Sequence, residues 1–160
     1  MAEVLFPELA GDYRRAVDGD PVGRDLYLRH YSRRQRADGR RPRLFVGPGE
    51  KSVLVTHGGG ALFVWRRFKD DSGQTGVNCA VFRREGGERA SDLIREAMQV
   101  AWARWPDERL YTYVDAGKIA SPNPGYCFKQ AGWRFCGRTK GGHGRPVLDI
   151  LECQPDWANA

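Results

Sequence analysis

The chain has 160 residues, of which 41% are hydrophobic and 18 are aromatic (five Trp, six Tyr and seven Phe), which is enough for the core of one globular domain. This composition excludes an intrinsically disordered chain, and no apolar run reaches the length that a membrane-spanning helix needs. The formal net charge of +6 favours a polyanionic partner such as nucleic acid.

The N-terminal residues MAEVLFPELAGD lack the basic and then apolar pattern of a secretory signal. The cysteines form neither a CxxC pair nor a zinc-ribbon spacing, so we expect reduced thiols. These observations predict a cytoplasmic protein with no membrane partner, organised as a single domain over residues 1–160. The four cysteines are Cys79, Cys127, Cys136 and Cys153.

The basic residues are 21 Arg against 5 Lys, and they cluster. Because guanidinium groups match phosphate oxygens, the clusters predict a double-stranded DNA surface. The alternative is a genome that favours Arg codons, combined with an ordinary solvated surface. The residues expected to contact phosphate are Arg29, Arg33, Arg34, Arg36, Arg40 and Arg41 in the first cluster, and Lys140, His143 and Arg145 in the second.

Residues 1–43 are expected to form an Arg-rich helical segment. A short helix is predicted around Tyr13 to Val17, between turns marked by glycine and proline. A longer one is predicted from Arg24 to Arg36, where apolar and aromatic residues recur at helical spacing until Pro42 forbids continuation.

Residues 44–152 are expected to contain the sheet and its helices. The runs RLFV, KSVLVTH, ALFVWRRF and VNCAVFRRE each predict a strand, and the last two predict a central antiparallel hairpin. The glycines at 58–60 predict a bulge or sharp turn before ALFVWRRF.

The second half alternates helices and strands. Ser91 is predicted to cap a helix that runs to about Trp105. A strand is predicted from Leu110 to Asp115. Asn123 is predicted to cap a short helix that ends at Gly132, and RFCGR and PVLDILE predict a closing hairpin. This order predicts an α/β (α+β) fold with one mixed sheet flanked by helices.

The run from Tyr111 to Glu152 resembles the C-terminal half of the GCN5-related N-acetyltransferase (GNAT) fold, and the element order is similar to that family from about Leu44 onward. The resemblance implies a mostly antiparallel central sheet, with substrate and acyl donor meeting in a cleft between splayed strands. It also implies that acyl-coenzyme A, or a related donor, lies with its pyrophosphate on the amides of a helix N-terminus. The family loop Arg/Gln-x-x-Gly-x-Gly/Ala is matched here by Arg84 and Gly87, whereas Arg89 occupies the last small position.

A narrower resemblance is to the Mom DNA-modification proteins of phage Mu. It is carried by His30-Tyr31-Ser32-Arg33, by WRRF, VFRRE and YVD, and by GYCFKQAGWRFCGRTKGG. It implies a phage-encoded enzyme that places an acetamido (carbamoylmethyl) group on adenine N6 and so protects DNA from restriction nucleases.

That resemblance implies site residues at matching positions. The functional residues of the family correspond to His30, Tyr31, Asp115 and Tyr126, and iron bound by the same four residues is an implied cofactor. The donor site would be formed by Arg83, Arg84, Gly87 and Ser91.

Several alternatives remain open at this stage. The His30–Tyr31 pair equally fits a helix face packed on the sheet, and Asp115 equally fits a cap on the turn before Gly117. A His/Tyr/Asp/Tyr group suits either a metal or acid–base work. The function is a Mom-type adenine modification, or an acyl transfer to an amine of a small molecule or protein, or non-catalytic nucleic-acid binding. A homodimer is also left open.

Overall fold

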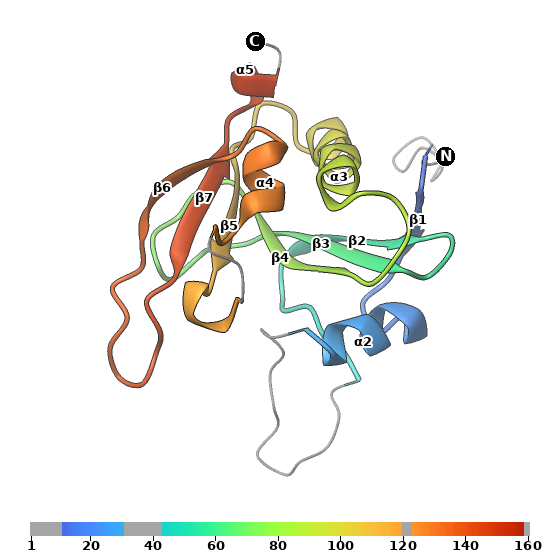
Figure 1. Cartoon of the computed structure of the whole chain (residues 1–160), viewed down its shortest axis with the longest axis horizontal. Coiled ribbons are helices and arrows are strands. Elements are labelled where there is room, and N and C mark those ends of the chain that lie inside the picture. Colours follow the sequence, from blue (N-terminus) through green and yellow to red (C-terminus); the bar gives the residue numbers. More distant parts are fainter. Residues whose placement is uncertain (1–10, 31–42, 120–122, 159–160) are drawn as a thin grey trace.

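The computed structural model describes residues 11–30, 43–119 and 123–158 (Figure 1). Within these residues seven strands form one sheet in the order β1-β2-β3-β4-β5-β7-β6. Each neighbouring pair is antiparallel except β4 with β5, which is parallel. The strands are β1 (Tyr13–Ala16), β2 (Glu50–Thr56), β3 (Ala61–Arg67), β4 (Val77–Arg84), β5 (Leu110–Val114), β6 (Arg134–Arg138) and β7 (Asp149–Cys153).

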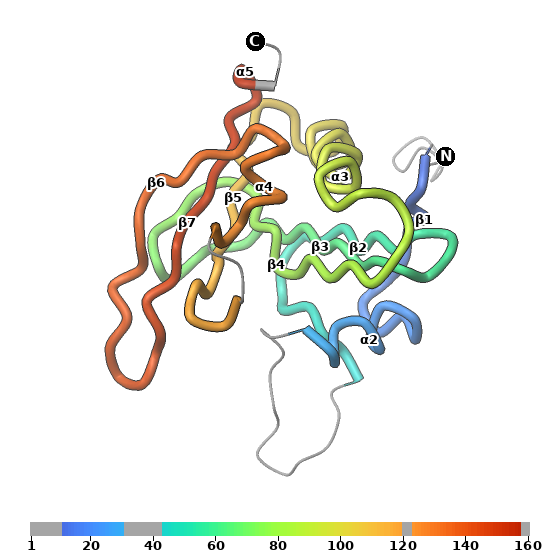
Figure 2. The backbone as a smooth tube through the Cα atoms, viewed as in Figure 1, coloured from blue at the N-terminus to red at the C-terminus, as the bar shows by residue number. Residues whose placement is uncertain are grey.

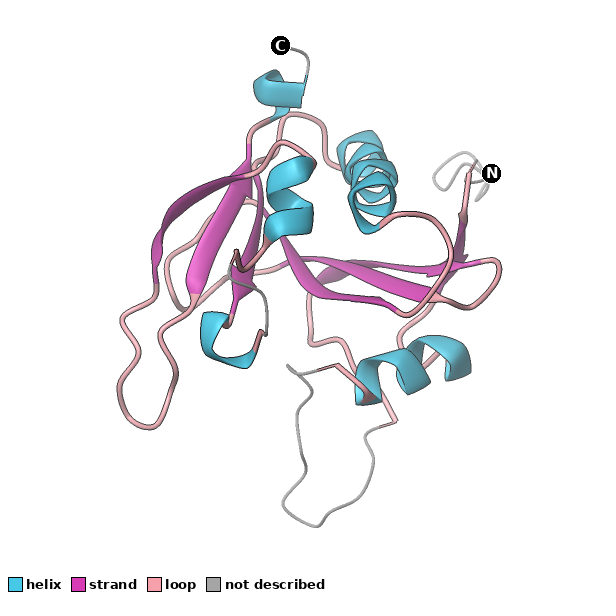
Figure 3. Cartoon of the chain, viewed as in Figure 1, coloured by secondary structure: helices cyan, strands magenta, loops and turns pink. Residues whose placement is uncertain are grey.

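Helices lie on both faces of the sheet (Figure 3). The helix α3 and the short helix α4 cover one face, and α2 lies on the opposite face, below the sheet in Figure 1. The predicted fold class, a mostly antiparallel mixed sheet flanked by helices, is confirmed. The helices are α2 (Pro21–Leu28), α3 (Ala90–Arg104), α4 (Tyr126–Gln130) and α5 (Pro155–Ala158), with a 3-10 turn η1 (Ala116–Lys118).

Two hydrophobic clusters fill the space between these layers. The larger one, on the α3 side, is centred on Trp65, whose indole N–H donates to the Ala97 carbonyl of α3 at 2.8 Å and whose ring stacks on Trp133. The smaller one, on the α2 side, contains Tyr27 stacked on Phe45. No helix of the described ranges is long and apolar enough to cross a bilayer.

The first strand corrects the predicted helix around Tyr13 to Val17. Tyr13 pairs with Thr56 of β2, and its buried phenol donates to the Leu93 carbonyl of α3 at 3.0 Å. Four residues are too few for a stable helix on their own, so the edge of β2, which needs a backbone partner, determines the local structure. The N-terminal segment is therefore only partly helical.

Two further predictions near the N-terminus are wrong. The helix expected from Arg24 to Arg36 is α2, which begins after the Asp20 cap and ends at Leu28, so His30 follows the helix instead of lying on its face. The run RLFV, residues 43–46, forms no strand. The carboxylate of Asp18 accepts hydrogen bonds from the amides of Phe45 and Val46, at 2.7 and 3.0 Å, and these amides are thereby taken from any strand partner.

The parallel pair of β4 and β5 is short. It comprises three residue pairs, of which Cys79 with Thr112 is the last. Beyond this pair β4 continues toward Arg84 beside β3, whereas β5 continues beside β7. The two strands therefore diverge in the middle of the sheet (Figure 2).

Candidate active site

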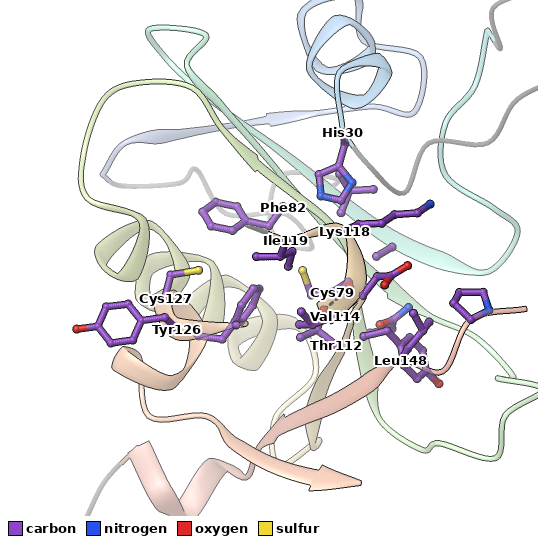
Figure 4. Close-up of a pocket in the computed structure, with 18 of the residues that line it drawn as sticks. His30, Cys79, Phe82, Thr112, Val114, Lys118, Ile119, Tyr126, Cys127 and Leu148 are labelled. Atoms are coloured by element: carbon purple, nitrogen blue, oxygen red, sulfur yellow. Dashed lines mark hydrogen bonds between the residues drawn. The ribbon is translucent and has the colours of Figure 1, made fainter. Parts of the chain in front are cut away.

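A pocket of about 600 Å³ opens where β4 and β5 diverge (Figure 4). Its lining comes from β4, β5, η1 and α4, together with His30 and the segment that leads into β7. The predicted cleft between splayed strands is therefore present. Most of the lining is apolar, so the few polar side chains that reach it carry the chemistry of the site.

The pocket reaches both faces of the sheet. On the α3 side it is lined by Cys79 and Val114, which belong to the larger hydrophobic cluster, and by residues of α4. On the α2 side it is lined by Val81, which belongs to the smaller cluster, and by His30. Two molecules entering from opposite faces could meet between the strands.

His30 is buried at the α2 side of the pocket, with 8% of its surface exposed. Burial and, to a smaller extent, the positive charge of Arg83 lower its pKa to about 4, against the opposing effect of a hydrogen bond to the backbone of Phe82. The imidazole is therefore neutral at physiological pH and able to accept a hydrogen bond or a proton.

Asp115 directly follows β5 and lines the same pocket. One of its carboxylate oxygens accepts a hydrogen bond from the Gly117 amide at 3.0 Å, so it caps the turn η1. The cap interpretation is thus confirmed, and the cap fixes the carboxylate at the pocket wall, whereas the functional role of Asp115 stays a prediction. Only 8% of Asp115 is exposed.

Tyr126 lines the pocket at the start of α4, but it is 53% exposed. Its hydroxyl accepts a hydrogen bond from Gln130 at 2.7 Å and points away from His30 in Figure 4. The cap of α4 is Gly125, not Asn123 as predicted. Gly125 has φ of +75°, and a β-carbon there would approach Leu151 to 2.5 Å, so a side chain at this position is excluded on both grounds.

The structure thus brings three of the four predicted site residues, His30, Asp115 and Tyr126, to one pocket. Tyr31 lies outside the described residues. Among those that are described, no group of three or more His, Cys, Asp or Glu side chains is placed to hold a metal ion. The outward direction of the Tyr126 hydroxyl also takes it away from His30, so these residues do not fit the implied iron site.

The loop before α3 is the predicted donor site, and it is held in shape by local contacts. Arg84 donates to the carbonyls of Glu88 and Gly87 at 2.6 and 3.2 Å. The carbonyl of Gly60 accepts from the amides of Glu85 and Gly86, at 2.7 and 3.2 Å. The sharp turn predicted from the glycines at 58–60 is confirmed, and through the Gly60 carbonyl it is hydrogen-bonded to this loop.

The N-terminus of α3 is open. Its N-cap is Arg89, which makes no side-chain capping bond, and the predicted cap Ser91 is instead the second helical residue and is buried. The Asp92 amide donates to the Arg89 carbonyl at 3.0 Å, so the amides of Ala90 and Ser91 are the ones in the first turn of this fifteen-residue helix that an anion could use. Arg83, the remaining predicted donor residue, pairs with Glu85 at 3.0 Å.

The predicted DNA contacts divide into three groups. Arg29 forms an ion pair with Glu85 at 2.6 Å, beside the donor loop. Lys140, His143 and Arg145 are exposed on the hairpin between β6 and β7, whose residue Pro146 lines the pocket. The predicted closing hairpin is confirmed by the pairing of β6 with β7, and its tip turns at His143, which has φ of 52° beside a bridge between Gly142 and Arg145. The others, Arg33, Arg34, Arg36, Arg40 and Arg41, lie outside the described residues.

Sequence reasoning missed two polar features of the pocket. Tyr113 lines it, and its hydroxyl contacts Ser72 and donates to Asp70 at 2.6 Å, while Tyr111 donates to the same carboxylate at 2.7 Å. Asn78 also lines it and is buried inside β4. The only signal for Asn78 was a polar residue in the otherwise apolar run VNCAVF.

Comparison with known proteins adds little beyond the geometry. No protein-family model matches the chain, and no curated protein matches it. One solved structure, a crystal structure titled "putative acetyltransferase" from Sphaerobacter thermophilus, superposes with a TM-score of 0.47 at 15% identity, over 94% of this chain and 99% of that one. At that distance the likeness supports no inference about activity, and the fold assignment rests on the strand order itself.

Proposed function

We propose that this protein is a GNAT-type transferase that moves an acyl group, from acyl-coenzyme A or a related donor, to an amine nitrogen. The observation that carries the proposal is the pocket between β4 and β5, which is lined from both faces of the sheet and along β4 as far as Phe82, shortly before the loop that leads into α3. Such a passage allows a donor and an acceptor to approach the same point from opposite sides.

The donor is assigned to the α3 side. The amides of Ala90 and Ser91 at the start of α3 fit a pyrophosphate, and Arg89, which pairs with Asp92 at 3.3 Å, would have to exchange that partner to join them. The bonds from Arg84 keep the loop in its shape. Acyl-coenzyme A would supply an acyl group activated as a thioester. The apolar wall of Cys79, Val114 and Phe128 would exclude water from that group.

The acceptor is assigned to the α2 side. An amine nitrogen attacks through its lone pair and must lose a proton as the new bond forms. His30, which is neutral, is placed to accept that proton, and Asp115 presents a carboxylate to the same space. Close placement of the two reactants supplies much of the rate enhancement in reactions of this kind.

A second, narrower candidate is the Mom-type reaction, in which the amine is N6 of adenine in double-stranded DNA and the group is acetamido. Two observations favour it. His30, Asp115 and Tyr126, the three described residues of the Mom-like set, line one pocket. The exposed basic hairpin with Lys140 and Arg145 continues into the pocket wall at Pro146, where it could hold phosphates while a flipped base enters.

Two experiments separate these candidates. Calorimetric titration with acetyl-coenzyme A, followed by turnover on a panel of amines, tests the transferase proposal, and absence of both binding and turnover would reject it for that donor. Mass spectrometry of nucleosides from plasmid DNA of expressing cells tests the narrower candidate. A new adenine derivative heavier by an acetamido group is expected, and it should be absent from cells that express Asp115→Ala.

A further inference from the structure

Asn78 carries an unpaired polar atom at the pocket. It lies on β4 at the second of the three residue pairs that join β4 to β5, opposite Tyr111, and only 7% of it is exposed. Its side-chain carbonyl oxygen is buried and has no hydrogen-bond partner among the described residues. The residue is nonetheless one of those that line the pocket.

The neighbouring hydroxyl groups do not donate to this oxygen, because each already donates a hydrogen bond to another acceptor. The hydroxyls of Tyr111 and Tyr113 donate to Asp70, and the hydroxyl of Thr112 donates to the Cys79 carbonyl at 3.0 Å. An unpaired buried carbonyl destabilises a folded protein, and native structures rarely contain one without a reason. At a pocket wall, the simplest reason is a hydrogen bond that a ligand supplies.

The charges around the pocket indicate whether the group that donates to Asn78 is charged or neutral. Lys118 lines the pocket, and the charge of Arg83 reaches His30. One oxygen of Asp115 is held by the Gly117 amide. An alkylammonium ion would meet the charge of Lys118 and would be drawn to the Asp115 carboxylate, whereas the neutral amide oxygen of Asn78 would compensate its charge only weakly. A neutral N–H group meets no such penalty.

An aromatic surface adds to this picture. Tyr113 lines the pocket, and it faces the α2 side because its neighbour Val114 packs in the cluster on the α3 side, so a flat acceptor would find one ring on which to stack.

We propose that Asn78 determines acceptor specificity by accepting a hydrogen bond from an N–H of a neutral, planar amine, the chemical class of the 6-amino group of adenine, and so discriminates against alkylammonium acceptors. This inference rests on the proposed function, because it places the acceptor in the same pocket.

The first test concerns the protein without ligand. The variant Asn78→Leu replaces the amide with an apolar group of similar shape and removes the unpaired oxygen. Its melting temperature should rise, by about 3 °C. The matched control is Asn123→Leu at an exposed position, where the side chain accepts a bond from Lys129 and no rise is expected. An Asn78→Leu protein that melts at or below the wild-type temperature would count against an unpaired oxygen.

The second test measures acceptor binding without any donor, by titrating ¹⁵N-labelled protein with adenosine, purine riboside and butylamine. Adenosine should bind about tenfold more tightly than either of the others, since purine riboside carries a hydrogen in place of the amino group and has no N–H on its base. Asn78→Leu and the smaller Asn78→Ala should both lose that preference. A preference that survives in both variants, or a wild-type protein that binds none of the three at millimolar concentration, would overturn the proposal.

Because no donor is present, this result is independent of the transferase proposal. Acyl transfer with an unchanged acceptor preference in Asn78→Leu would reject the role of Asn78 alone. Adenosine binding that depends on Asn78, without any acyl transfer, would reject the transferase alone.

Discussion

The hydroxyl of Thr112 donates a hydrogen bond of 3.0 Å to the backbone carbonyl of Cys79, across the last residue pair that β4 and β5 share. The bond joins the two strands at the point where they begin to diverge. Thr112 and Cys79 both line the pocket, so the same bond closes its inner end.

Removing this bond should weaken the junction between the two halves of the sheet. Thr112→Val keeps the shape of the side chain and leaves the Cys79 carbonyl without that partner, so we expect a loss of about 1–2 kcal/mol in the free energy of unfolding. Urea denaturation measures it. Thr112→Ser retains the hydroxyl and should lose less, and equal losses in the two variants would show that the methyl group matters more than the bond.

Substitutions of Asp115 separate its cap from its proposed role at the pocket. Asp115→Asn can still accept from the Gly117 amide and should keep wild-type stability, whereas Asp115→Ala should lose about 1 kcal/mol. Both should lower kcat/KM at least about 100-fold if the carboxylate acts on the acceptor. Thermal melts and steady-state kinetics read the two effects separately. Full activity in Asp115→Asn would show that the carboxylate has no role at the acceptor and that Asp115 serves only to cap the turn.

His30 should make stability depend on pH in acid. Its folded-state pKa is about 4, below the unfolded value near 6.5, so between these values the unfolded chain binds more protons. Above about pH 6.5 His30 has no effect on the free energy of unfolding. Between about pH 6.5 and pH 4 its preferential protonation in the unfolded chain lowers that free energy progressively, by up to about 3 kcal/mol. Comparing wild type with His30→Gln across this window isolates it, and parallel curves for the two proteins would contradict the lowered pKa.

The support of the donor loop by Gly60 can be tested by sterics. A β-carbon at Gly60 would lie 2.9 Å from the Gly86 carbonyl oxygen, so Gly60→Ala must displace the loop. We expect a cost of about 1 kcal/mol, which is roughly a fivefold rise in the Kd for acetyl-coenzyme A. Gly58→Ala is the matched control, because a β-carbon at Gly58 meets no atom within 4 Å. Equal Kd values for acetyl-coenzyme A in the two variants would show that the turn at Gly60 does not contribute to donor binding.

The basic hairpin predicts salt-dependent affinity for DNA. Changing Lys140 and Arg145 together to Ala should lower the slope of log K against log salt by about 2, one for each phosphate that the variant no longer neutralises. Arg138 is the control, because it is already paired with Asp149 at 3.0 Å and its change to Ala should have a smaller effect. Fluorescence anisotropy with a DNA duplex measures the slopes. A double variant with the wild-type slope would show that Lys140 and Arg145 do not contact DNA phosphates.

The strands that the sequence predicted well are those that need no distant partner to be recognised. The runs that form β2, β3 and β4 are apolar and bounded by glycine, and local pattern was sufficient for them. The elements that failed depend on tertiary contacts. The edge of β2 pairs with Tyr13, and the Asp18 carboxylate takes the amides of Phe45 and Val46.

The candidate site shows the same division. His30, Asp115 and Tyr126 were found through a resemblance of short motifs, and their meeting at one pocket is a result of the fold. Asn78 could not be found in this way, because what distinguishes it is a buried side-chain oxygen without a hydrogen-bond partner among the described residues. Whether a polar side chain is satisfied depends on neighbours from another strand, and a single sequence does not reveal them.

A pocket lined from both faces of the sheet has a kinetic consequence. Neither reactant has to leave before the other enters, so both can occupy the protein at the same time. Initial-rate plots at several fixed concentrations of the second reactant would then intersect. Parallel lines, the mark of a modified-enzyme intermediate, would contradict a pocket that holds both reactants at once.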